Sequence, residues 1–534
     1  MSSPERPPMD VAADHASPDR YGNWKAPSAD GDLLIWPSPD ELLSDTLENG
    51  KRLRSANHVL IQNVPLPEIR RRLREFIGLA EPAAPLLAAG HQTELHHPGV
   101  WVKNALIDTA AARLGGQAIH FAVDTDAPKH LALRWPSDDG TATVEPLSDD
   151  PARGGDAWSG RLRPPSPAHL ARVSERFKRA AEAWDFKPLV PEFLTSLRRL
   201  ALESVNLSTA LTNALHELDL QLGLRHRAML VSPICASEPY LAFVHHVLAH
   251  AGDFAADYNA ALDDYRRSNK IRTPGRPMPN LRCDADICEV PFWLDDLSTG
   301  SRARANVTRT AGGQWVLVPP PKSRSPLPVP SSPLPAFTFN PAADGWEAAA
   351  ALLDWLQRNN LRLSPRALTL TSVLRLLAAD QFVHGIGGGQ YDQVTDALIA
   401  RHFGVTPPRF AVTTATLYFP GAAQRSRACV PCVLQEGRRL KHGLLGDEKM
   451  KLVQAIAAAP RGSTDRSILF HEMHHKLADA AGRHPSLQRW EQKLQATERH
   501  EQAERLLFDR ELFYAIQPAQ RLAGLIDRCR TALQ

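Results

Sequence analysis

The stretch that decides the fold is Pro85–Pro136, PLLAAGHQTELHHPGVWVKNALIDTAAARLGGQAIHFAVDTDAPKHLALRWP. A short apolar run breaks at Gly90 into a polar loop that is rich in histidine. Pro98 then opens a segment whose apolar residues recur at spacings of three and four, which predicts an amphipathic helix. A second apolar run ends in Asp124 and Asp126. The order of strand, loop, helix and strand predicts a βαβ unit.

Polar side chains follow both strands of this unit, at the point where each strand ends. Ligands of open α/β sheets bind at the carboxyl ends of the parallel strands. Histidines beside a helix N-terminus suit an anionic group, because backbone amides and imidazoles both donate hydrogen bonds. Aspartates suit a metal ion, an amine or a ribose. The predicted catalytic residues are His91, His96, Asp124 and Asp126, and the predicted substrate-binding residues of this unit are Gln92, Glu94, His97 and Lys103.

The rest of the chain extends this unit into an α/β protein. We predict a doubly wound core that is interrupted by helices and by short strands with turn signals. Charges at i, i+4 spacing over 485–513 predict a coiled-coil-like helical arm. In chain order we predict a disordered arm over 1–30, a first part of the core over 31–280 with a helical insertion near 167–222, a small antiparallel β insert with a proline-rich connector over 281–335, a second part of the core over 336–420, and a helical C-terminal region over 421–534.

Length and composition restrict the class of protein. A chain of 534 residues exceeds the size at which one hydrophobic core keeps growing, and 43% hydrophobic with 23% charged residues is typical of soluble globular proteins. A net charge of +3 gives no case for nucleic acid as a partner, and no apolar run reaches the length of a membrane span. Six cysteines in so long a chain do not indicate a disulfide framework, so we expect a reducing, cytoplasmic location.

A second candidate site is the glycine-rich segment His384–Asp392, HGIGGGQYD. We expect a turn that runs into a helix over 391–402, so that backbone amides and the positive helix end approach a ligand. The segment lacks the lysine and Ser/Thr of a P-loop and is not a dinucleotide fingerprint. A flexible turn between two helices is the alternative. The predicted substrate-binding residues here are Gly387, Gly388, Gly389, Tyr391 and Asp392.

A third candidate is the sequence HEMHH, which matches the H-E-x-x-H pattern of zinc enzymes. On a helix, His471 and His475 would share one face and hold zinc, with Glu472 polarising a bound water. The alternative is an exposed helix face, which the neighbouring Lys476 favours. The leading interpretation therefore includes no metal site, and these three residues are kept as the zinc hydrolase alternative.

Four of the six cysteines form two closely spaced pairs in the sequence. Cys429 and Cys432 have the spacing of a zinc or redox site. A tetrahedral zinc site needs a second pair, and Cys283 with Cys288 is the only candidate, at a wider spacing. We therefore favour thiols that are buried as small hydrophobic side chains.

The first two motifs together resemble the cysteine ligase family of bacillithiol biosynthesis (BshC), of which this chain would be a divergent member. That family has a loop of the type Gly-Gln-Gln after an early strand, then a helix with an aromatic residue and a lysine, and an acidic strand end. Further on it has a Gly-Gly segment that opens a helix, a Phe-Gly pair and a proline-rich approach to another strand. The residues in these places are Gly90-His91-Gln92 and Leu95, Trp101 and Lys103, Asp124-Thr125-Asp126, Gly387-Gly388 with Tyr391, Phe403-Gly404, and Pro407-Pro408-Arg409. His91 stands where the family has glutamine.

The resemblance implies a Rossmann-like core with inserted segments and a helical arm. It also implies a ligase that joins cysteine to an amino sugar conjugate through an amide-type bond. The leading prediction is thus a cytoplasmic, ligase-like enzyme with a small-molecule substrate, a nucleotide or a divalent metal as possible cofactors, and a homodimer formed through the C-terminal helices. The alternatives are the zinc-dependent hydrolase and a non-catalytic scaffold that self-associates through the arm.

Overall fold

The computed structural model divides the chain into two compact units. Unit 1 comprises 1–132, 146–417 and 513–534, and unit 2 comprises 133–145 and 418–512. The predicted connector over 319–335 lies outside the described residues, as does most of the predicted arm over 1–30. The described residues are 21, 23–79, 81, 83–137, 142–151, 157–273, 275–310, 312–318, 336–422 and 429–534.

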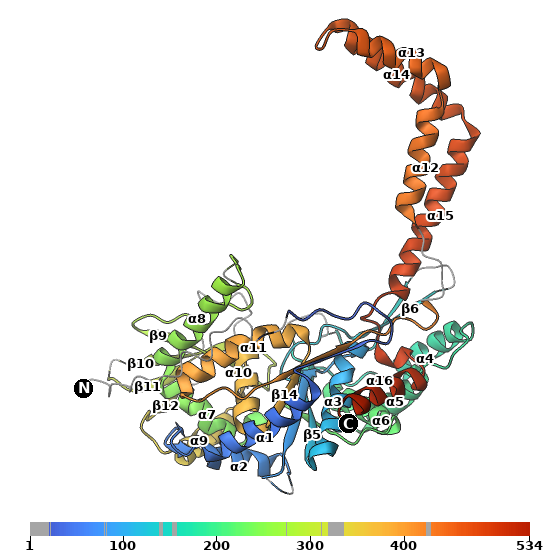
Figure 1. Ribbon diagram of the computed structural model, residues 1–534. Helices are drawn as coiled ribbons and strands as arrows, with labels where there is room; N and C mark the ends of the chain where they lie inside the picture. The colour runs from blue at the N-terminus through green and yellow to red at the C-terminus, as the bar shows by residue number, and fades with distance from the viewer. Residues whose placement is uncertain are drawn as a thin grey trace. The chain divides into compact units, whose positions relative to one another are not determined.

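A six-stranded, mostly parallel sheet forms the centre of unit 1, so the predicted α/β class is confirmed (Figure 1). The βαβ unit is also confirmed, because β4 and β5 are parallel neighbours joined by helix α3. β1 is the one antiparallel strand and pairs with β15 at the edge. The strands are β1 Leu33–Trp36, β4 Leu86–Gln92, β5 Gln117–Val123, β8 Arg227–Leu230, β14 Gln381–His384 and β15 Ala411–Ala415, in the order β1-β15-β14-β4-β5-β8.

The strand order reverses beside β4. The chain adds β5 and then β8 on one side of β4, and later adds β14 and then β15 on the other side. Val383 of β14 pairs with Ala89 of β4 in parallel register, so both strands end at the same edge of the sheet. Ligands of open α/β sheets bind outside the carboxyl ends of the strands at such a reversal. A ligand is therefore expected to bind at the edge between β4 and β14.

β4 extends further than the sequence predicts. The strand continues through Gly90 to Gln92 and pairs with β5 over its whole length, where a polar loop was expected to begin at Gly90. The physical reason is close packing: a side-chain carbon at Gly90 would lie 3.3 Å from Phe121 O and 3.4 Å from the Phe382 ring. Glycine here permits a tight strand and does not end it.

Helices cover both faces of the sheet. Leu86, Ala88, Ile119 and Phe121 of the strands belong to one large core with α2 and α7, whereas the alternate side chains face α3. In Figure 1, α3, α5, α6 and α16 lie to the right of β14 and β5, and α7, α9 and α10 lie to the left. The helices of unit 1 are α1 Pro39–Ser55, α2 Leu66–Phe76, α3 Pro98–Leu114, α4 Pro167–Ala181, α5 Val190–Glu203, α6 Leu207–Gln221, α7 Glu238–Ala249, α8 Ala251–Ser268, α9 Gly345–Arg358, α10 Ala367–Val373, α11 Ile386–Leu398 and α16 Ala519–Ala532.

A second sheet of five antiparallel strands also belongs to unit 1. The three strands predicted over 287–318 are present, and two strands that the sequence did not indicate join them. Both additional strands are short and are defined by their partners, not by a local pattern. The strands are β9 Ile287–Asp296, β10 Arg302–Arg309, β11 Trp315–Val318, β12 Phe337–Phe339 and β13 Leu361–Pro365, in the order β12-β11-β10-β9-β13.

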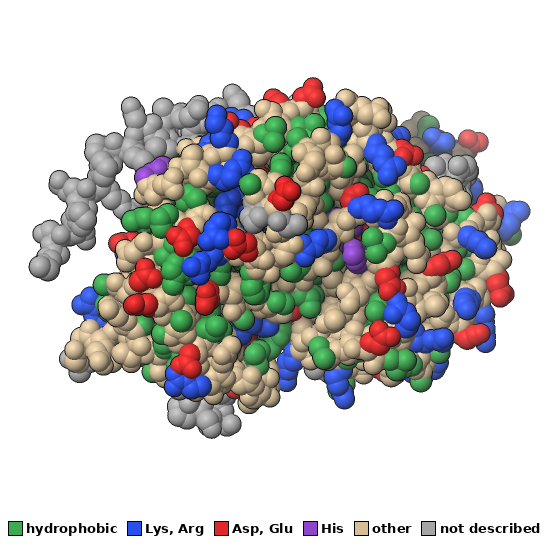
Figure 2. All heavy atoms as spheres, turned by 90° about the horizontal axis from the view of Figure 1, so that it is seen from below, with side chains coloured by type: hydrophobic (Ala, Val, Ile, Leu, Met, Phe, Trp, Pro, Cys, Tyr) green, Lys and Arg blue, Asp and Glu red, His purple; other side chains and the backbone are tan. Residues whose placement is uncertain are grey.

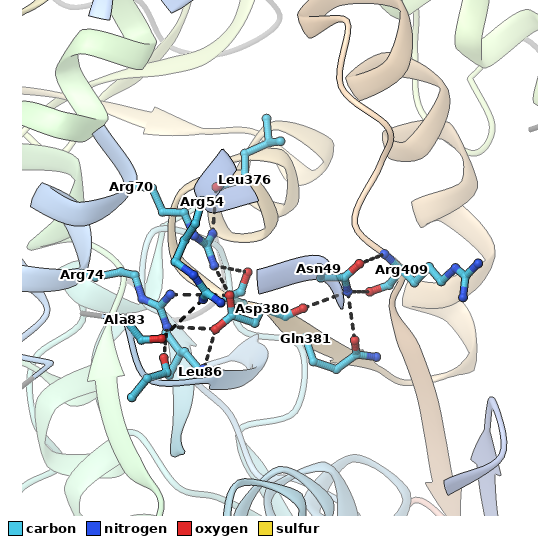
Figure 3. Close-up of polar contacts among 12 residues, drawn as sticks. Asn49, Arg54, Arg70, Arg74, Ala83, Leu86, Leu376, Asp380, Gln381 and Arg409 are labelled. Atoms are coloured by element: carbon cyan, nitrogen blue, oxygen red, sulfur yellow. Dashed lines mark hydrogen bonds and ion pairs between the residues drawn. The ribbon is translucent and has the colours of Figure 1, made fainter. Parts of the chain in front are cut away.

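A buried ion cluster holds the amino ends of β4 and β14 together (Figure 3). Asp380 is 1% exposed and accepts hydrogen bonds from Arg70 Nη2 at 2.5 Å and from Arg74 Nη2 at 3.0 Å. Its second oxygen also accepts from Leu86 N, the first residue of β4, at 2.7 Å. One carboxylate thus joins α2 to two neighbouring strands, at the edge opposite the candidate site.

Unit 2 is mainly helical. Trp490 of α15 packs on α12, where its Nε1 donates to Val433 O at 2.7 Å and its ring leaves no room for a side chain at Gly437. The segment from Phe513 onward, which falls within the predicted C-terminal region, belongs to unit 1, where α16 contacts α3. The remaining elements are α12 Val430–Gly443, α13 Gly446–Ala458, α14 Thr464–Arg483, α15 Pro485–Leu507, β6 Ala132–Pro136 and β7 Ala142–Pro146.

The cysteine pairs differ from expectation. Cys283 is bonded to Cys288 and Cys429 to Cys432, so neither pair is a pair of free thiols. Cys429 and Cys432 are also exposed, because they lie at the start of a helix and not in the core. The prediction of two buried thiol pairs is therefore wrong.

The surface is charged in a mixed way. On the face drawn in Figure 2, basic and acidic side chains are interspersed. In the part of the chain that the structure describes, every helix is too short or too polar to cross a membrane.

Candidate functional site

Five ionisable side chains, called here the β4 cluster, lie at the carboxyl end of β4. His91 Nδ1 lies 3.4 Å from Glu94 Oε1. The ring centroids of His91 and His96 are 5.0 Å apart, and those of His96 and His120 are 5.5 Å apart. The His91 side chain is 25% exposed while the other members are buried, so the cluster meets solvent at His91. The members are His91, Glu94, His96, Lys103 and His120.

Lys103 reaches the cluster from α3. Its Nζ donates to Gly90 O at 2.8 Å, and the residue is only 2% exposed. Burial lowers the pKa of Lys103 to about 7, although nearby Glu94 opposes the shift. A large fraction of this amine is therefore uncharged at neutral pH. An uncharged amine accepts a proton or attacks a carbonyl carbon, which an ordinary lysine does poorly.

The histidines of the cluster are uncharged. Burial lowers the pKa of His96 to about 4 and those of His91 and His120 well below 6.5, and Lys103 adds to the effect on His91. His96 Nε2 lies 3.2 Å from Gln92 O, and Tyr514 N donates to His96 O at 2.8 Å. A neutral imidazole at the solvent end of the cluster can accept a proton from a substrate.

Glu94 and His97 have structural partners. Glu94 Oε2 accepts from Lys129 N at 2.7 Å and from His130 N at 3.1 Å, which fixes the carboxylate beside His91. His97 is the N-cap of α3, and its Nδ1 accepts from Gly99 N at 3.1 Å. A role for either residue in substrate binding stays a prediction.

A polar network continues from the cluster into the protein. His120 Nδ1 lies 2.8 Å from Asn104 Oδ1, and Asn104 Nδ2 donates to Asp219 Oδ2 at 2.9 Å. Asp219 also accepts from Trp101 Nε1 at 2.7 Å and from the Tyr514 hydroxyl at 3.2 Å. Burial raises the pKa of Asp219 to about 6 against these hydrogen bonds. The carboxyl group, which α6 carries, is thus held by two side chains of α3 and by Tyr514.

This network borders a cavity of about 20 Å³, which is room for one water molecule. Thr93 Oγ1, Thr212 Oγ1 and His226 Nδ1 belong to its lining residues and have no hydrogen-bond partner among the described residues. The lining is therefore polar enough to hold an ordered water. Because the cavity is too small for a substrate, a substrate must bind outside it, on the exposed side of His91.

Asp124 and Asp126, at the end of β5, differ in what they can contact. Asp124 is 1% exposed, and its Oδ1 accepts from Ser232 N at 2.8 Å. Burial raises the pKa of Asp124, and the hydrogen bonds from Ser232 oppose the shift. Asp126 is exposed, and its Oδ2 accepts from Gln92 Nε2 at 3.1 Å, which ties the end of β5 to the end of β4. Only Asp126 is open to a substrate as the side chains stand.

An arginine cluster that the sequence analysis missed lies over the end of β5. Arg302 donates to Asp295 Oδ1 at 2.7 Å and also to Thr125 O at 2.7 Å, which connects the second sheet to the candidate site. Four guanidinium groups share two carboxylates, so positive charge remains for an anionic ligand. The cluster comprises Arg302, Arg304, Arg362 and Arg366, with Asp295 and Glu289 as acidic partners.

Part of this cluster had a signal in the sequence. Arg302-Ala303-Arg304 alternates with the period of a strand, a pattern that puts both arginines on one face of β10. Nothing local indicates that Arg362 of β13 and Arg366, the N-cap of α10, join this cluster. Trp158 completes the arrangement, with the guanidinium carbons of Arg302 and Arg362 4.9 and 5.5 Å from its ring centroid.

The glycine segment is the first turn of α11 and not a loop. α11 begins at Ile386, with Gly385 as its N-cap, directly after β14. Since Val383 pairs with Ala89, the turn follows β14 at the edge where β4 ends. First-turn amides of a helix have no partner within that helix and favour anions. The segment therefore lies beside the β4 cluster, on the other side of the strand-order reversal.

Asp392 joins two other side chains at this end of α11. It is 2% exposed, lies 2.5 Å from Arg375 Nη1, and contacts His384 Nε2 at 2.9 Å. Burial opposes ionisation, but Arg375 and His384 outweigh it and lower the pKa of Asp392 to about 2. Asp392 is thus a fixed carboxylate that orients His384, whereas Tyr391, next to it, is 42% exposed and open to a ligand.

Two of the three consecutive glycines are expected to respond differently to alanine. A Cβ at Gly389 would lie 2.5 Å from Val412 Cγ2 and 3.1 Å from the Trp24 ring, so Gly389→Ala should lower the free energy of unfolding by about 1–3 kcal/mol. A Cβ at Gly387 meets no atom within 4 Å, and Gly387→Ala should be neutral or slightly stabilising. Urea unfolding of both variants measures this. Equal destabilisation by the two would contradict the tight packing of α11 on β15.

Acid should destabilise unit 1 through its uncharged histidines. The unfolded chain binds a proton at His96 below pH 6.5, whereas the native protein does not until about pH 4. The unfolded state therefore binds more protons within this window, and the free energy of unfolding falls as the pH decreases from 6.5 to 4. The loss for this one histidine is about 3 kcal/mol at most.

Denaturant unfolding at several pH values tests this expectation. His96→Gln keeps a polar group near Gln92 O but does not titrate, so its unfolding free energy should depend less on pH. The expectation fails if wild type and variant show the same slope between pH 6.5 and 4.

The HEMHH sequence lies on α14 of unit 2. The helix is as predicted, but His475 is exposed and its Nδ1 lies 3.3 Å from Asp479, while Glu472 pairs with Lys476 at 3.3 Å. Among the described residues, no group of three or more His, Cys, Asp or Glu side chains is arranged to hold a metal ion. The surroundings of His471 and His475 thus resemble an exposed helix face.

No protein-family model matches the sequence, and no curated protein is similar to it at a significant level. The function must therefore be inferred from the site itself.

Proposed function

We propose that this chain is an enzyme that binds an anionic small molecule at the carboxyl edge between β4 and β14 and forms a carbon–nitrogen bond there. The observation that carries the proposal is the position of the β4 cluster. It lies at the strand-order reversal, between an exposed helix start and an exposed aspartate. If the five parallel strands are numbered along the chain, their order across the sheet is 3-2-1-4-5. A Rossmann-like core has this order, which supports assigning unit 1 to that class.

Each part of the edge suits one requirement of the reaction. An amine must lose a proton before it attacks a carboxyl carbon, and uncharged His91 or Lys103 can accept that proton. Asp126 can hold the ammonium form of the same amine before the reaction. The first-turn amides of α11 and the arginine cluster can hold a carboxylate or phosphate.

The resemblance to the cysteine ligases supplies the candidate substrates. In the reaction it implies, the amine of an amino sugar conjugate attacks the carboxyl carbon of cysteine, and an amide-type bond forms as the carboxyl oxygen or an activating group leaves. Phosphate-binding groups at the edge are compatible with a nucleotide as the activating co-substrate. A divalent metal would find Asp126 as an exposed oxygen ligand.

A product assay tests the proposal. The full chain is incubated with cysteine and amino sugar conjugates, with and without ATP and Mg²⁺, and products are detected by mass spectrometry. The expected result is a product that joins both substrates, which His91→Ala reduces and His475→Ala on α14 leaves unchanged. Cleavage of the conjugate that requires His475 but not His91, without a joined product, would favour the zinc hydrolase alternative instead.

The predicted self-association through the C-terminal helices is a second proposal, with another copy of this chain as the partner. α13 has no buried residue, and it exposes Met450 and Val453, while α14 exposes Ile468 and Phe470. A helix of 13 residues is marginal without packing, so a partner surface would stabilise it. Sedimentation should show a dimer that Phe470→Asp dissociates. A monomer at all concentrations would refute self-association without affecting the enzyme proposal.

A further inference from the structure

The exposed cysteine pair of unit 2 forms a disulfide within the first turn of α12. Cys429 is the N-cap of this 14-residue helix, and its Sγ accepts the backbone N–H of Cys432 at 3.2 Å. Both residues are exposed, so solutes can reach either sulfur. The pair belongs to unit 2, whereas the parallel sheet belongs to unit 1, and the reaction proposed at the sheet does not use it.

We propose that Cys429 and Cys432 are a redox-active pair that exchanges electrons with disulfides of other molecules. A thiol at a helix N-terminus has a lowered pKa, because the helix amides and dipole stabilise the thiolate. The N–H of Cys432 already points at Cys429 Sγ, so the thiolate formed on reduction finds its donor in place. Thiolate character and exposure are the two properties that reactive cysteines combine.

A purely structural role explains this disulfide poorly. Disulfides stabilise mainly by restricting the unfolded chain, and the effect becomes smaller as the closed loop becomes shorter. Cys429 and Cys432 are three positions apart in one helix, so their bond joins no distant segments. In the Cys283–Cys288 pair only Cys283 is exposed, because Cys288 is 7% exposed and lies in the core of unit 1.

The exchange proceeds in two balanced steps. The Cys429 thiolate attacks one sulfur of a substrate disulfide and the substrate S–S bond breaks. The first substrate thiol leaves, and a mixed disulfide between Cys429 and the other half of the substrate remains. The Cys432 thiolate then attacks Cys429 Sγ and releases the second thiol, so that two electrons have passed from the pair to the substrate. Two equivalents of a low-molecular-weight thiol, which become a disulfide, reduce the pair again.

Trapping experiments on the full chain test the proposal. After reduction, Cys432→Ser should accumulate a mixed disulfide with oxidised glutathione at Cys429, detected by peptide mass spectrometry. Cys429→Ser retains a good helix cap. Its Cys432 should form the adduct much more slowly than Cys429 does in Cys432→Ser. In Cys432→Ser, iodoacetamide should modify Cys429 at pH 7 more than threefold faster than an unstructured cysteine peptide. Burial raises the pKa values of Cys235 and Cys529 to about 12, so these thiols serve as unreactive internal controls.

Catalysis is measured by the reduction of insulin with dithiothreitol as the electron donor. Wild type and Cys283→Ser/Cys288→Ser should accelerate the reaction equally, whereas either single variant at 429 or 432 should not. The proposal is overturned if Cys429 reacts no faster than the cysteine peptide, or if wild type accelerates the reduction no more than Cys429→Ser does. Circular dichroism of each variant confirms that the helices remain.

Discussion

Asp380→Asn should lower the free energy of unfolding by about 3–5 kcal/mol, because it leaves two buried arginines without a counter-charge. The carboxylate accepts from both guanidinium groups and from the backbone of β4. Burial already lowers the pKa of Arg70 to about 10, with Asp380 as the main opposing charge. Urea unfolding measures the loss, which should occur with little change in the slope against denaturant.

The matched control lies on α2, the helix that carries Arg70 and Arg74. Arg71 and Glu75 form an i, i+4 pair at 2.5 Å whose side chains are about half exposed, so Glu75→Gln should change stability by less than about 1 kcal/mol. A similar small effect of Asp380→Asn would mean that the amino ends of β4 and β14 are not joined by this carboxylate.

Lys103→Met should reduce the rate of product formation about 100- to 10,000-fold if the amine acts as the general base, the range typical of such groups. Methionine fills similar volume beside Gly90, so the fold should be retained. Lys103→Arg keeps a positive charge but cannot lose its proton near neutral pH, so it should be nearly as inactive. A role limited to binding an anion would instead be rescued by arginine.

The pH dependence separates these roles further. With Lys103 as the base, the wild-type rate should rise as the pH increases through about 7, because the amine then loses its proton. The variants should lack this rise in whatever residual rate they show. An unchanged profile in Lys103→Arg would exclude the lysine as the titrating group.

Local structure near Pro85–Pro136 could be predicted from the sequence, because its signals are local. Proline and glycine punctuate the helix, apolar spacing gives its face, and runs of small and branched residues give the strands. Two features differed. β4 extends past Gly90, whose packing depends in part on the distant Phe382, and the strand β6 was not indicated by the sequence.

The order of the strands could not be predicted in the same way. β14 has four residues, and its place beside β4 depends on pairing and on Asp380, whose arginine partners lie about 300 residues away in the sequence. The arginine cluster likewise combines β10 with β13, whose alternation of apolar and polar residues covers only four positions. The sequence named candidate residues on both sides of the site, but it missed the groups that other segments bring to it.

Hydrogen exchange with bound substrate tests the central proposal most directly. The measurement compares amide exchange in the full chain with and without cysteine and an amino sugar conjugate at saturating concentration. Our account predicts slower exchange in residues 90–97, 124–130 and 385–389, and unchanged exchange in α14. Protection confined to α14, or absent from all three segments while the substrates bind, would contradict a site at the edge between β4 and β14.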